Sequence, residues 1–460
     1  MQTMQQILDT VLKRIKPSSR EEDSVRKFVS DVMRVAKTVS GLDCVVVGSI
    51  GKFTWLSNDH DIDVFMLFPK ETPREELEKK GLEYGKKIVE NLKGKAKVKY
   101  AEHPYTHAII KGFDVDIVPC YRIQKGEHIQ SAVDRSPLHL SYALDHLTPR
   151  MADEVRLLKQ FCKAQDVYGS DEKHQGFSGY ICELLIIYYQ SFEAVVKAAA
   201  EWKAPQVVDV FGFTDRTKFP EQPLIIIDPV DKNRNAAAVV NAENFVRFVS
   251  ACRQFAEKPS ANFFNFKPVQ PMTSKQIKYL MNRGTRFFAL AMSSPDVVED
   301  VLYPQLRKAR KRIENLLHHN EFPVLRSYEF VGNKKAFIIF EIEAPVLPPV
   351  KAMEGPPITS KPHTEEFLAK YRGKAFLYLS GSRWMAEVKR GSRTPAELME
   401  KFLRKEKPAL VAEGVPTYIA DVISKCSITE QERFFSYVKT DKNLSDFLRQ
   451  KYFADISKGL

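Results

Sequence analysis

The chain has 460 residues, of which 70 are lysine or arginine and 58 are aspartate or glutamate, so its formal charge is +12. At roughly 150 residues per domain this length predicts about three domains, and a hydrophobic content of 44% is ample for packed cores. The composition excludes a disordered chain and a small disulfide-held scaffold. The positive excess favours a polyanion such as nucleic acid if it gathers on one face.

Cysteine spacing and hydropathy indicate the compartment. The six cysteines include no C-x-x-C pair, which argues against a zinc site and against a secreted disulfide framework. The first residues lack the apolar run and cleavage site of a signal peptide, and no stretch approaches the roughly 18 apolar residues of a membrane span. We therefore expect a soluble, cytoplasmic protein with no membrane partner.

Apolar periodicity in the first third predicts helices that flank a sheet. The expected elements, in chain order, are a helix over 4–15 that stops at Pro17, a second helix that starts after Ser18 or Ser19 and stops at Gly41, strands over 44–47 and 62–68, and a hairpin that joins 105–110 to 113–119 through Lys111 and Gly112. We read residues 1–150 as one α/β domain.

The rest of the chain predicts a helical centre and a mixed α+β C-terminal part. Residues 151–258 are mainly helical, interrupted by an apolar stretch at 224–227, and form the expected central domain. We expect a body at 259–318, completed by 394–460, and a β-rich tail at 319–393 with two hairpins. Six prolines between Pro345 and Pro362 predict an exposed, stiff loop inside this tail.

Two aspartates on one strand are the first chemical signal. In a strand over 62–68 the side chains alternate, so Asp61 and Asp63 lie on one face and apolar residues on the other. Adjacent carboxylates repel and tend to keep their protons unless a cation lies between them, and a hard ion such as Mg²⁺ prefers oxygen ligands. An isolated D-x-D pattern also occurs on solvated strand edges, so the pair alone does not decide the function.

Residues before and after this strand strengthen the metal interpretation. Gly48 and Ser49 follow an apolar strand and precede a short segment that could be helical, where backbone N–H groups and a hydroxyl can hold a phosphate. Lys52 adds a positive charge. Asp114 and Asp116 share one face of a later strand, and a third carboxylate there completes the arrangement that two-metal nucleotidyl transfer requires.

These motifs resemble those of a known superfamily. Gly48-Ser49, the Asp61-Ile62-Asp63 pair and the later Asp116 are similar to the nucleotidyltransferases typified by DNA polymerase beta. The resemblance narrows to the archaeal (class I) CCA-adding enzymes, the tRNA nucleotidyltransferases. The stretches that carry it are HPYTHAIIKGFDVDIVPCY, SAVDRSP, EVRLLKQFCKAQDVYG, GFSGYICELLI and DPVDKNRNAA, dense over the first 260 residues and sparse in the last 130.

The resemblance implies the architecture and the partners. It implies a polymerase-beta-like head at 1–150, a helical central domain, an α+β body, and a tail at 319–393 that holds the tRNA elbow by shape and backbone. Its substrates would be tRNA, CTP and ATP. The tail could equally be a dimerisation module, so a homodimer is an alternative that the sequence leaves open.

It also implies roles for individual residues. The terminal hydroxyl of tRNA would attack the α-phosphate of CTP or ATP, with Asp61 and Asp63 bridging two Mg²⁺ ions and Asp116 completing the catalytic set; Asp114 is the less favoured ligand. The nucleotide-binding residues would be Gly48, Ser49, Lys52, Lys159 and Tyr168 at the triphosphate, His103 and Ser136 near the sugar, and Arg234 at the Watson-Crick edge of the base.

Other charged residues have plainer interpretations. Glu183 lies in an apolar helical run, and we expect it to form a structural ion pair. A basic cluster extends nearly round the helix at 303–317, so part of it is solvated surface, but Arg307, Lys308 and Lys311 are candidates for contacts with tRNA phosphates. The alternative functions are a poly(A) polymerase or oligoadenylate synthetase-like transferase with the same carboxylates, and a catalytically silent RNA-binding protein.

Overall fold

The computed structural model of the protein describes residues 3–100, 102–209 and 218–453, which fall into two compact units; the chain passes from the first to the second between Lys267 and Pro268. The helices of the first unit are α1 (Met4–Ile15), α2 (Ser19–Ser40), α3 (Gly48–Gly51), α4 (Arg74–Asn91), η1 (Ala132–Asp134), α5 (Arg135–His146), α6 (Pro149–Ala164), α7 (Gly179–Tyr189), α8 (Phe192–Ala199), α9 (Ala242–Glu257) and η3 (Ala261–Phe264). Its strands are β1 (Asp43–Val46), β2 (Asp61–Phe68), β3 (Lys97–Tyr100), β4 (Pro104–Ile110), β5 (Phe113–Tyr121), β6 (Gln206–Val208), β7 (Leu224–Asp228) and β8 (Asp231–Asn235).

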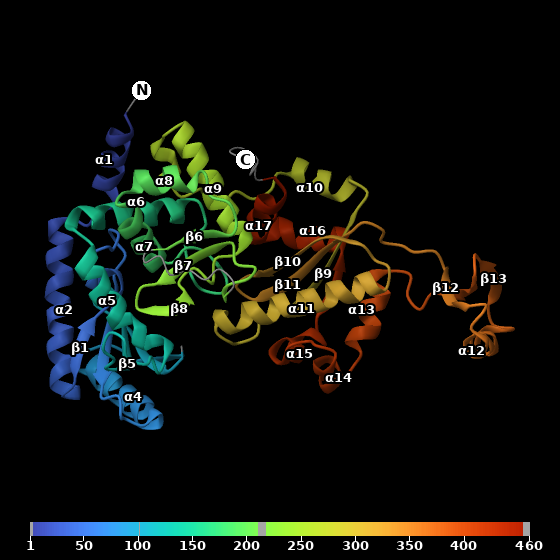
Figure 1. The fold of residues 1–460 in the computed structure, drawn as a ribbon, viewed down its shortest axis with the longest axis horizontal. Helices are drawn as coiled ribbons and strands as arrows, with labels where there is room; N and C mark the ends of the chain where they lie inside the picture. The colour runs from blue at the N-terminus through green and yellow to red at the C-terminus, as the bar shows by residue number, and fades with distance from the viewer. Residues whose placement is uncertain (1–2, 101, 210–217, 454–460) are drawn as a thin grey trace. The chain divides into compact units, whose positions relative to one another are not determined.

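A five-stranded sheet in the order β1-β2-β5-β4-β3 organises the N-terminal part of this unit. Strands β2 and β5 run parallel, and the remaining pairs are antiparallel. Ile62, Val64 and Met66 of β2 are buried on one face of the sheet, where α2 and α4 pack against the strands (Figure 1). The predicted helices, strands and hairpin of this part are confirmed, and the opposite face of β2 and β5 is left for the aspartates.

Helix α4 approaches the sheet through two glycines. A Cβ atom at Gly81 would lie 2.6 Å from the Cβ atom of Pro119, and one at Gly85 would overlap the side chain of Thr106. Real Cβ atoms do not come so close to other atoms. Both glycines, one turn apart, therefore allow α4 to lie directly on β4 and β5.

The central part of the first unit is held by an apolar core. Helices α6, α7, α8 and α9 surround fully buried aromatic rings, among them Phe161, Phe192, Phe248 and Phe255. The apolar helical run around Glu183 ends with α7 at Tyr189, because Gln190 adopts a left-handed backbone conformation, and α8 follows as a separate helix. The short sheet β6-β7-β8 lies in the same unit and contains the predicted apolar stretch at 224–227.

The second unit contains the helices α10 (Ser274–Asn282), α11 (Glu299–His319), α12 (Lys361–Tyr371), α13 (Pro395–Leu403), α14 (Lys407–Ala412), α15 (Thr417–Ile423), α16 (Gln431–Thr440) and α17 (Lys442–Phe453). Its strands are β9 (Arg286–Ser293), β10 (Val324–Val331), β11 (Lys335–Ile342), β12 (Val350–Pro357), β13 (Phe376–Ser380), β14 (Arg383–Lys389) and β15 (Ser427–Glu430).

A four-stranded sheet in the order β10-β11-β9-β15 forms the core of this unit. Helix α11 packs along it, as Figure 1 shows. Both predicted hairpins are present, but the first one, β10-β11, joins β9 of the expected body rather than the small sheet β12-β14-β13. The domain boundaries remain a proposal. Because β10 and β11 belong to the four-stranded sheet, the small sheet that begins with β12 at Val350 favours a start of the tail nearer residue 350 than 319. Residues 454–460 of the expected body lie outside the described residues.

The expected stiff loop between Pro345 and Pro362 is wrong in part, because residues 350–357 form strand β12 and α12 begins at Lys361. Within the part of the chain that the structure describes, strand β12 pairs only with β14, and the pairing shifts register between Glu354 and Pro357. An edge strand tolerates proline because one of its sides needs no N–H donor. Among the described residues, none of the helices is both long and apolar enough to cross a membrane.

The glycine contacts of α4 give a prediction. Gly85→Ala should lower the free energy of unfolding by about 1 to 3 kcal/mol because overpacking against Thr106 outweighs the better helix propensity of alanine. Thermal unfolding of the two proteins measures the difference. Lys86→Ala, at the exposed neighbouring position of α4, is the control and should change stability little. Equal stability of Gly85→Ala and the parent would show that α4 does not lie this close to β4.

Candidate active site

Four aspartates meet on the open face of the sheet because β2 and β5 are parallel and in register. Asp61 pairs with Asp114 and Asp63 with Asp116 across the two strands. The intervening residues Ile62 and Val115 point into the core. The predicted common face of Asp61 and Asp63 is therefore confirmed, and the third carboxylate expected on the neighbouring strand lies beside it.

The electrostatics of this group favour a bound cation. Burial, together with the charges of Asp116 and Asp61, raises the pKa of Asp63 to about 6. Burial and the nearby carboxylates of Asp59 and Asp114 also raise the pKa of Asp61. Each carboxylate makes ionisation of its neighbour less favourable, which is the condition that a divalent cation relieves.

The turn after β1 faces Asp63. Gly48 has a positive φ of 65° and begins the short helix α3. A Cβ atom at this position would overlap the carboxylate of Asp63, so only glycine allows the backbone to pass so close to it. The sequence-predicted Gly48-Ser49 turn thus lies next to the predicted metal-binding strand.

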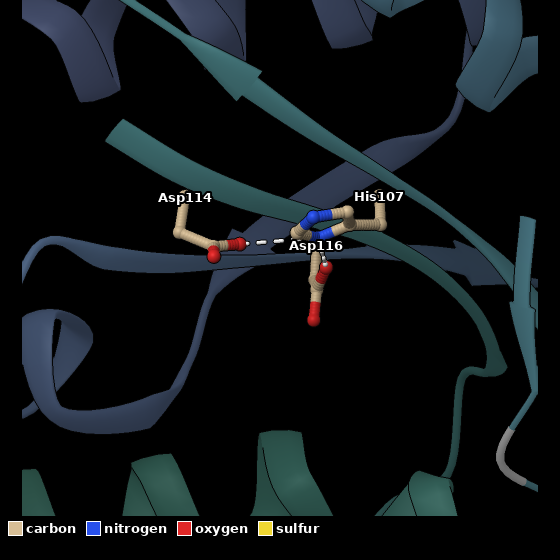
Figure 2. A group of neighbouring side chains, drawn as sticks. All are labelled: His107, Asp114 and Asp116. Atoms are coloured by element: carbon tan, nitrogen blue, oxygen red, sulfur yellow. Dashed lines mark hydrogen bonds and ion pairs between the residues drawn. The ribbon is translucent and has the colours of Figure 1, made fainter. Parts of the chain in front are cut away.

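His107 of β4 lies over the carboxylates of β5. Its Nδ1 atom is 2.8 Å from Oδ1 of Asp116 and 3.1 Å from Oδ1 of Asp114, and Figure 2 shows the ring in contact with both. These three side chains bring their ligand atoms within 4.8 Å of one another. Contact with His107 leaves Asp116 its other oxygen, and hydrogen-bonded support of a ligating carboxylate is usual in metal sites.

A cleft of about 440 Å³ opens beside the aspartates. Its lining includes these residues from α3, β2, α5, α6, α7 and the loops next to them: Gly48, Ser49, Lys52, Asp59, Asp61, Asp63, Ser136, His139, Lys159, Lys163, Tyr168, Tyr180 and Glu183. It therefore joins the expected metal site to most of the expected nucleotide-binding residues.

A buried ion triad forms one wall of the cleft. The Nζ atom of Lys52 is 2.7 Å from Oε2 of Glu183, and that of Lys159 is 3.6 Å from Oε1. Thr54 connects Glu183 with Lys159, because its hydroxyl donates to Glu183 at 3.0 Å and accepts from Lys159 at 2.9 Å. Burial raises the pKa of the Glu183 carboxyl, but the two ammonium groups outweigh burial and hold this pKa below its usual value.

This triad confirms the expected ion pair of Glu183, and it also gives the cleft wall an excess of positive charge. Two lysines share one carboxylate, so the wall keeps one uncompensated positive charge if both lysines are protonated. Burial lowers the pKa of Lys159, and Glu183 opposes this effect. An anion that enters the cleft would meet a preformed positive wall next to the carboxylates.

Two expected nucleotide-binding residues do not line the cleft. His103 is buried elsewhere, with its Nδ1 atom 3.3 Å from Glu78 and its ring against Tyr121. Arg234 of β8 donates to Asp228, which in turn contacts two cleft residues, His139 and Tyr180. Their roles at the sugar and at the base remain proposals.

Sequence reasoning missed several lining residues, notably His139, Tyr180 and the pair Asp59 and Lys163, whose charged atoms are 2.8 Å apart. A signal existed for His139, because it follows Ser136 by three residues on a helix and so lies on the same face. Asp59 and Lys163 come from separate segments, and only the packing of α6 against the loop before β2 brings them together.

The expected tRNA contacts lie on α11 in the second unit. Lys308 and Lys311 are exposed, and Arg307 is half-buried. Two other members of the basic cluster have structural partners: Arg310 pairs with Glu329 at 2.7 Å and Arg312 with Glu413 at 3.4 Å. Part of the cluster thus stabilises the unit itself, and Arg307, Lys308 and Lys311 remain the candidates for phosphate contacts.

The residues present fit a divalent metal. The open face offers carboxylate oxygens from Asp61, Asp63, Asp114 and Asp116, which are the ligands that Mg²⁺ prefers. The raised pKa values of Asp61 and Asp63 arise from repulsion and burial that a cation would offset. The structure thus supports a divalent-cation site on β2 and β5.

Three family models match successive parts of the chain. They are described as a nucleotidyltransferase domain, over residues 26–139, the second domain of tRNA nucleotidyltransferase, over 153–265, and the C-terminal domain of CCA-adding enzyme, over 283–426. Among solved structures, the chain resembles a cytoplasmic RNA terminal U-transferase, with 15% identity, a TM-score of 0.46, and coverage of 58% of this chain and 99% of the other.

Curated relatives match over most of their length. The CCA-adding enzyme of Methanosarcina acetivorans is 38% identical over 85% of this chain and 88% of its own. That of Methanoregula boonei is 36% identical over 93% of both chains, and that of Methanocaldococcus jannaschii 38% over 82% and 86%. With identity above 30% over most of the sequence, the chain belongs to the family of archaeal CCA-adding enzymes.

Proposed function

We propose that this protein builds or repairs the 3′-terminal CCA of tRNA without a nucleic-acid template, using CTP and ATP and releasing pyrophosphate. The observation that carries the proposal is the face of β2 and β5, where Asp61, Asp63 and Asp116 lie next to a cleft of about 440 Å³ with a positive wall. Membership of the CCA-adding family supplies the identity of the substrates.

Asp61, Asp63 and Asp116 would hold the divalent metal, as two Mg²⁺ ions in our proposal. The metal would lower the pKa of the attacking hydroxyl and stabilise charge on the transferring phosphoryl group. His107 fixes the orientation of Asp116 through the 2.8 Å contact at Nδ1. Asp114, which pairs with Asp61 across the strands, has a half-exposed side chain and is the less favoured ligand.

The cleft orients the nucleotide from the other side. Ser49 and the backbone of α3 offer hydrogen-bond donors, and Lys52 and Lys159 provide positive charge close to Asp63. Opposite charges on the two sides of one cleft would place the β- and γ-phosphates at the lysines and the α-phosphate at the aspartates. This placement leaves pyrophosphate on the cationic side, where it would be released.

The RNA end must reach the same aspartates from outside the cleft. In our proposal Lys308, Lys311 and Arg307 of α11 contribute phosphate contacts to tRNA, and the segment from about residue 350 to 389 holds the elbow. A homodimer is a further proposal, and its test is the oligomeric state in solution.

The function is tested by measuring the incorporation of labelled nucleotides in the presence of Mg²⁺. CTP and ATP are supplied each alone and both together, to tRNA transcripts that end before CCA, after C and after CC. Ordered addition that stops after A is expected. Long A tracts would instead support a poly(A) polymerase, and firm tRNA binding without incorporation would support a silent binding protein.

The catalytic carboxylates give the next prediction. Asp116→Asn should reduce incorporation by about a thousandfold or more, because it weakens the metal site, and it should leave tRNA binding close to that of the parent. Asp114→Asn is the matched control on the same strand and face and should lose much less activity. Equal losses in the two variants would show that Asp116 has no special role, and loss of tRNA binding would show a structural one.

The raised pKa of Asp63 predicts a pH-dependent stability. Its folded pKa of about 6 exceeds the unfolded value, so the stabilising contribution of the protonated carboxyl is complete below about pH 4 and is lost as pH rises to about 6. In chelator at pH 7.5, Asp63→Asn should therefore raise the free energy of unfolding, by up to about 3 kcal/mol. Urea unfolding at pH 7.5 and pH 4.5 tests this.

The gain from Asp63→Asn should shrink at the lower pH, because the parent carboxyl is then already protonated. Mg²⁺ should stabilise the parent more than the variant. A variant less stable than the parent at pH 7.5 would mean that Asp63 contributes a necessary native interaction as the anion.

The triad predicts a coupling between stability and nucleotide binding. Glu183→Gln should lower the free energy of unfolding by about 3 to 5 kcal/mol, because it leaves two buried ammonium groups uncompensated. CTP or ATP should then raise the melting temperature of the variant more than that of the parent. Glu193→Gln removes an exposed pair with Lys197 and should change stability by about 0.5 kcal/mol at most. If CTP or ATP raised the melting temperature of Glu183→Gln and of the parent equally, the lysines of the triad would not bind the nucleotide phosphates.

A further inference from the structure

Asp228 at the end of β7 is a fully buried carboxylate that receives hydrogen bonds at both oxygens. Its Oδ2 atom is 2.6 Å from Nη1 of Arg234 and 2.9 Å from Nε2 of His139. Its Oδ1 atom accepts from the hydroxyl of Tyr180 at 3.0 Å and from the backbone N–H of Val230 at 3.1 Å. Each of the three side-chain donors comes from a different element: α5, α7 and β8.

The hydrogen bonds keep Asp228 ionised. Burial raises its pKa, but the hydrogen bond from His139, the Val230 N–H and the charge of Arg234 outweigh burial and lower it to about 2. An ionised carboxylate only accepts hydrogen bonds. His139 must therefore carry a proton on Nε2. Burial lowers the pKa of the His139 ring below its usual value, so the ring is neutral near pH 7.5 and keeps its acceptor at Nδ1.

The network reaches the cleft through two of its members. His139 and Tyr180 line the cleft, and their rings stack with centroids 3.8 Å apart at 24°. The ammonium group of Lys52, a member of the triad, lies 5.0 Å from the centroid of Tyr180. Asp228 itself has no exposed surface and is not among the lining residues.

Arg234 is the partly exposed member of the network. Its side chain keeps 37% of its surface accessible although Nη1 is bound to Asp228. A guanidinium held at one nitrogen presents its other N–H donors in a fixed plane. A free arginine side chain loses rotational freedom when a ligand binds. Because Asp228 already restricts Arg234, ligand binding costs less conformational entropy.

We propose that Asp228 is a positioning residue that fixes the orientation of Arg234 and the tautomer of His139, and so sets the affinity and selectivity of the site for CTP and ATP without touching the nucleotide. This inference rests on the proposed function. It applies to the same cleft and names the buried group on which nucleotide discrimination depends. Buried support of this kind typically changes activity by about 10- to 100-fold when it is removed.

The test compares Asp228→Asn with Glu341→Gln. Glu341, in the second unit, is also a fully buried carboxylate, and it accepts from Arg283 at 2.7 Å and from the hydroxyl of Tyr452 at 2.9 Å. Both substitutions remove the charge from a buried carboxylate that holds an arginine and a tyrosine. Both should lower the melting temperature, so stability alone does not distinguish a positioning role from a structural one.

Kinetics distinguish the two roles. Asp228→Asn should raise the KM for CTP and ATP by about tenfold or more, change kcat much less, and increase incorporation of UTP and GTP relative to CTP and ATP. Glu341→Gln should leave KM for the nucleotides and discrimination unchanged. A folded Asp228→Asn protein with parental KM and discrimination would overturn the proposal.

Arg234→Lys tests the same contact from its exposed end, in case Asp228→Asn does not fold. It keeps the charge but loses the planar fork, so discrimination should fall as in Asp228→Asn; parental discrimination would contradict the proposal. Calorimetric binding of CTP, ATP, UTP and GTP without tRNA separates the positioning role of Asp228 from the proposed CCA addition, because it needs no catalysis. If the parent adds no CCA, the proposed function fails, and the loss of nucleotide preference on Asp228→Asn still decides the role of Asp228.

Discussion

The parallel pairing of β2 with β5 is the constraint on which the active site depends. Parallel register brings Asp61 next to Asp114 and Asp63 next to Asp116, and it does so because apolar residues between them fill the core beneath α2 and α4. A shift by one residue would turn every carboxylate into that core, at a cost of several kcal/mol for each buried charge. Hydrophobic burial thus holds in place a group of like charges that repel one another. A divalent cation that binds between them would relieve this repulsion, and the relief favours binding.

Charge is balanced differently on the two sides of the cleft. On the metal side the anions of β2 and β5 lack equal positive charge, whereas on the wall formed by Lys52, Lys159 and Glu183 the cations are in excess. A triphosphate with its metal would complement both sides at once. The buried carboxylates Glu183 and Asp228 support this arrangement from behind the cleft surface. Glu183 accepts from Lys52, and Asp228 accepts from His139, so each one holds a cleft side chain in place.

Several elements could be predicted because their signal is local. The alternation around Asp61 and Asp63, the turn at Gly48 and the hairpins at residues 105–119 and 324–342 depend only on neighbours in sequence. The strand β12 was missed because proline density usually indicates a loop, and only its position at the edge of a sheet makes those prolines tolerable. His103 and Arg234 were expected to line the nucleotide site, but the structure directs His103 towards Glu78 and ties Arg234 to Asp228.

The sequence by itself determined the chemistry: an acidic pair on one strand face, a third carboxylate on a later strand, a glycine-serine turn, and motifs that identify the family. Residue type and spacing of two, three or four positions carry that information. Tertiary structure alone decided which distant groups meet, such as Glu183 with Lys52, Asp228 with His139, and Asp59 with Lys163. These partners come from different segments, and their contacts arise from the packing of whole elements, which no local pattern encodes.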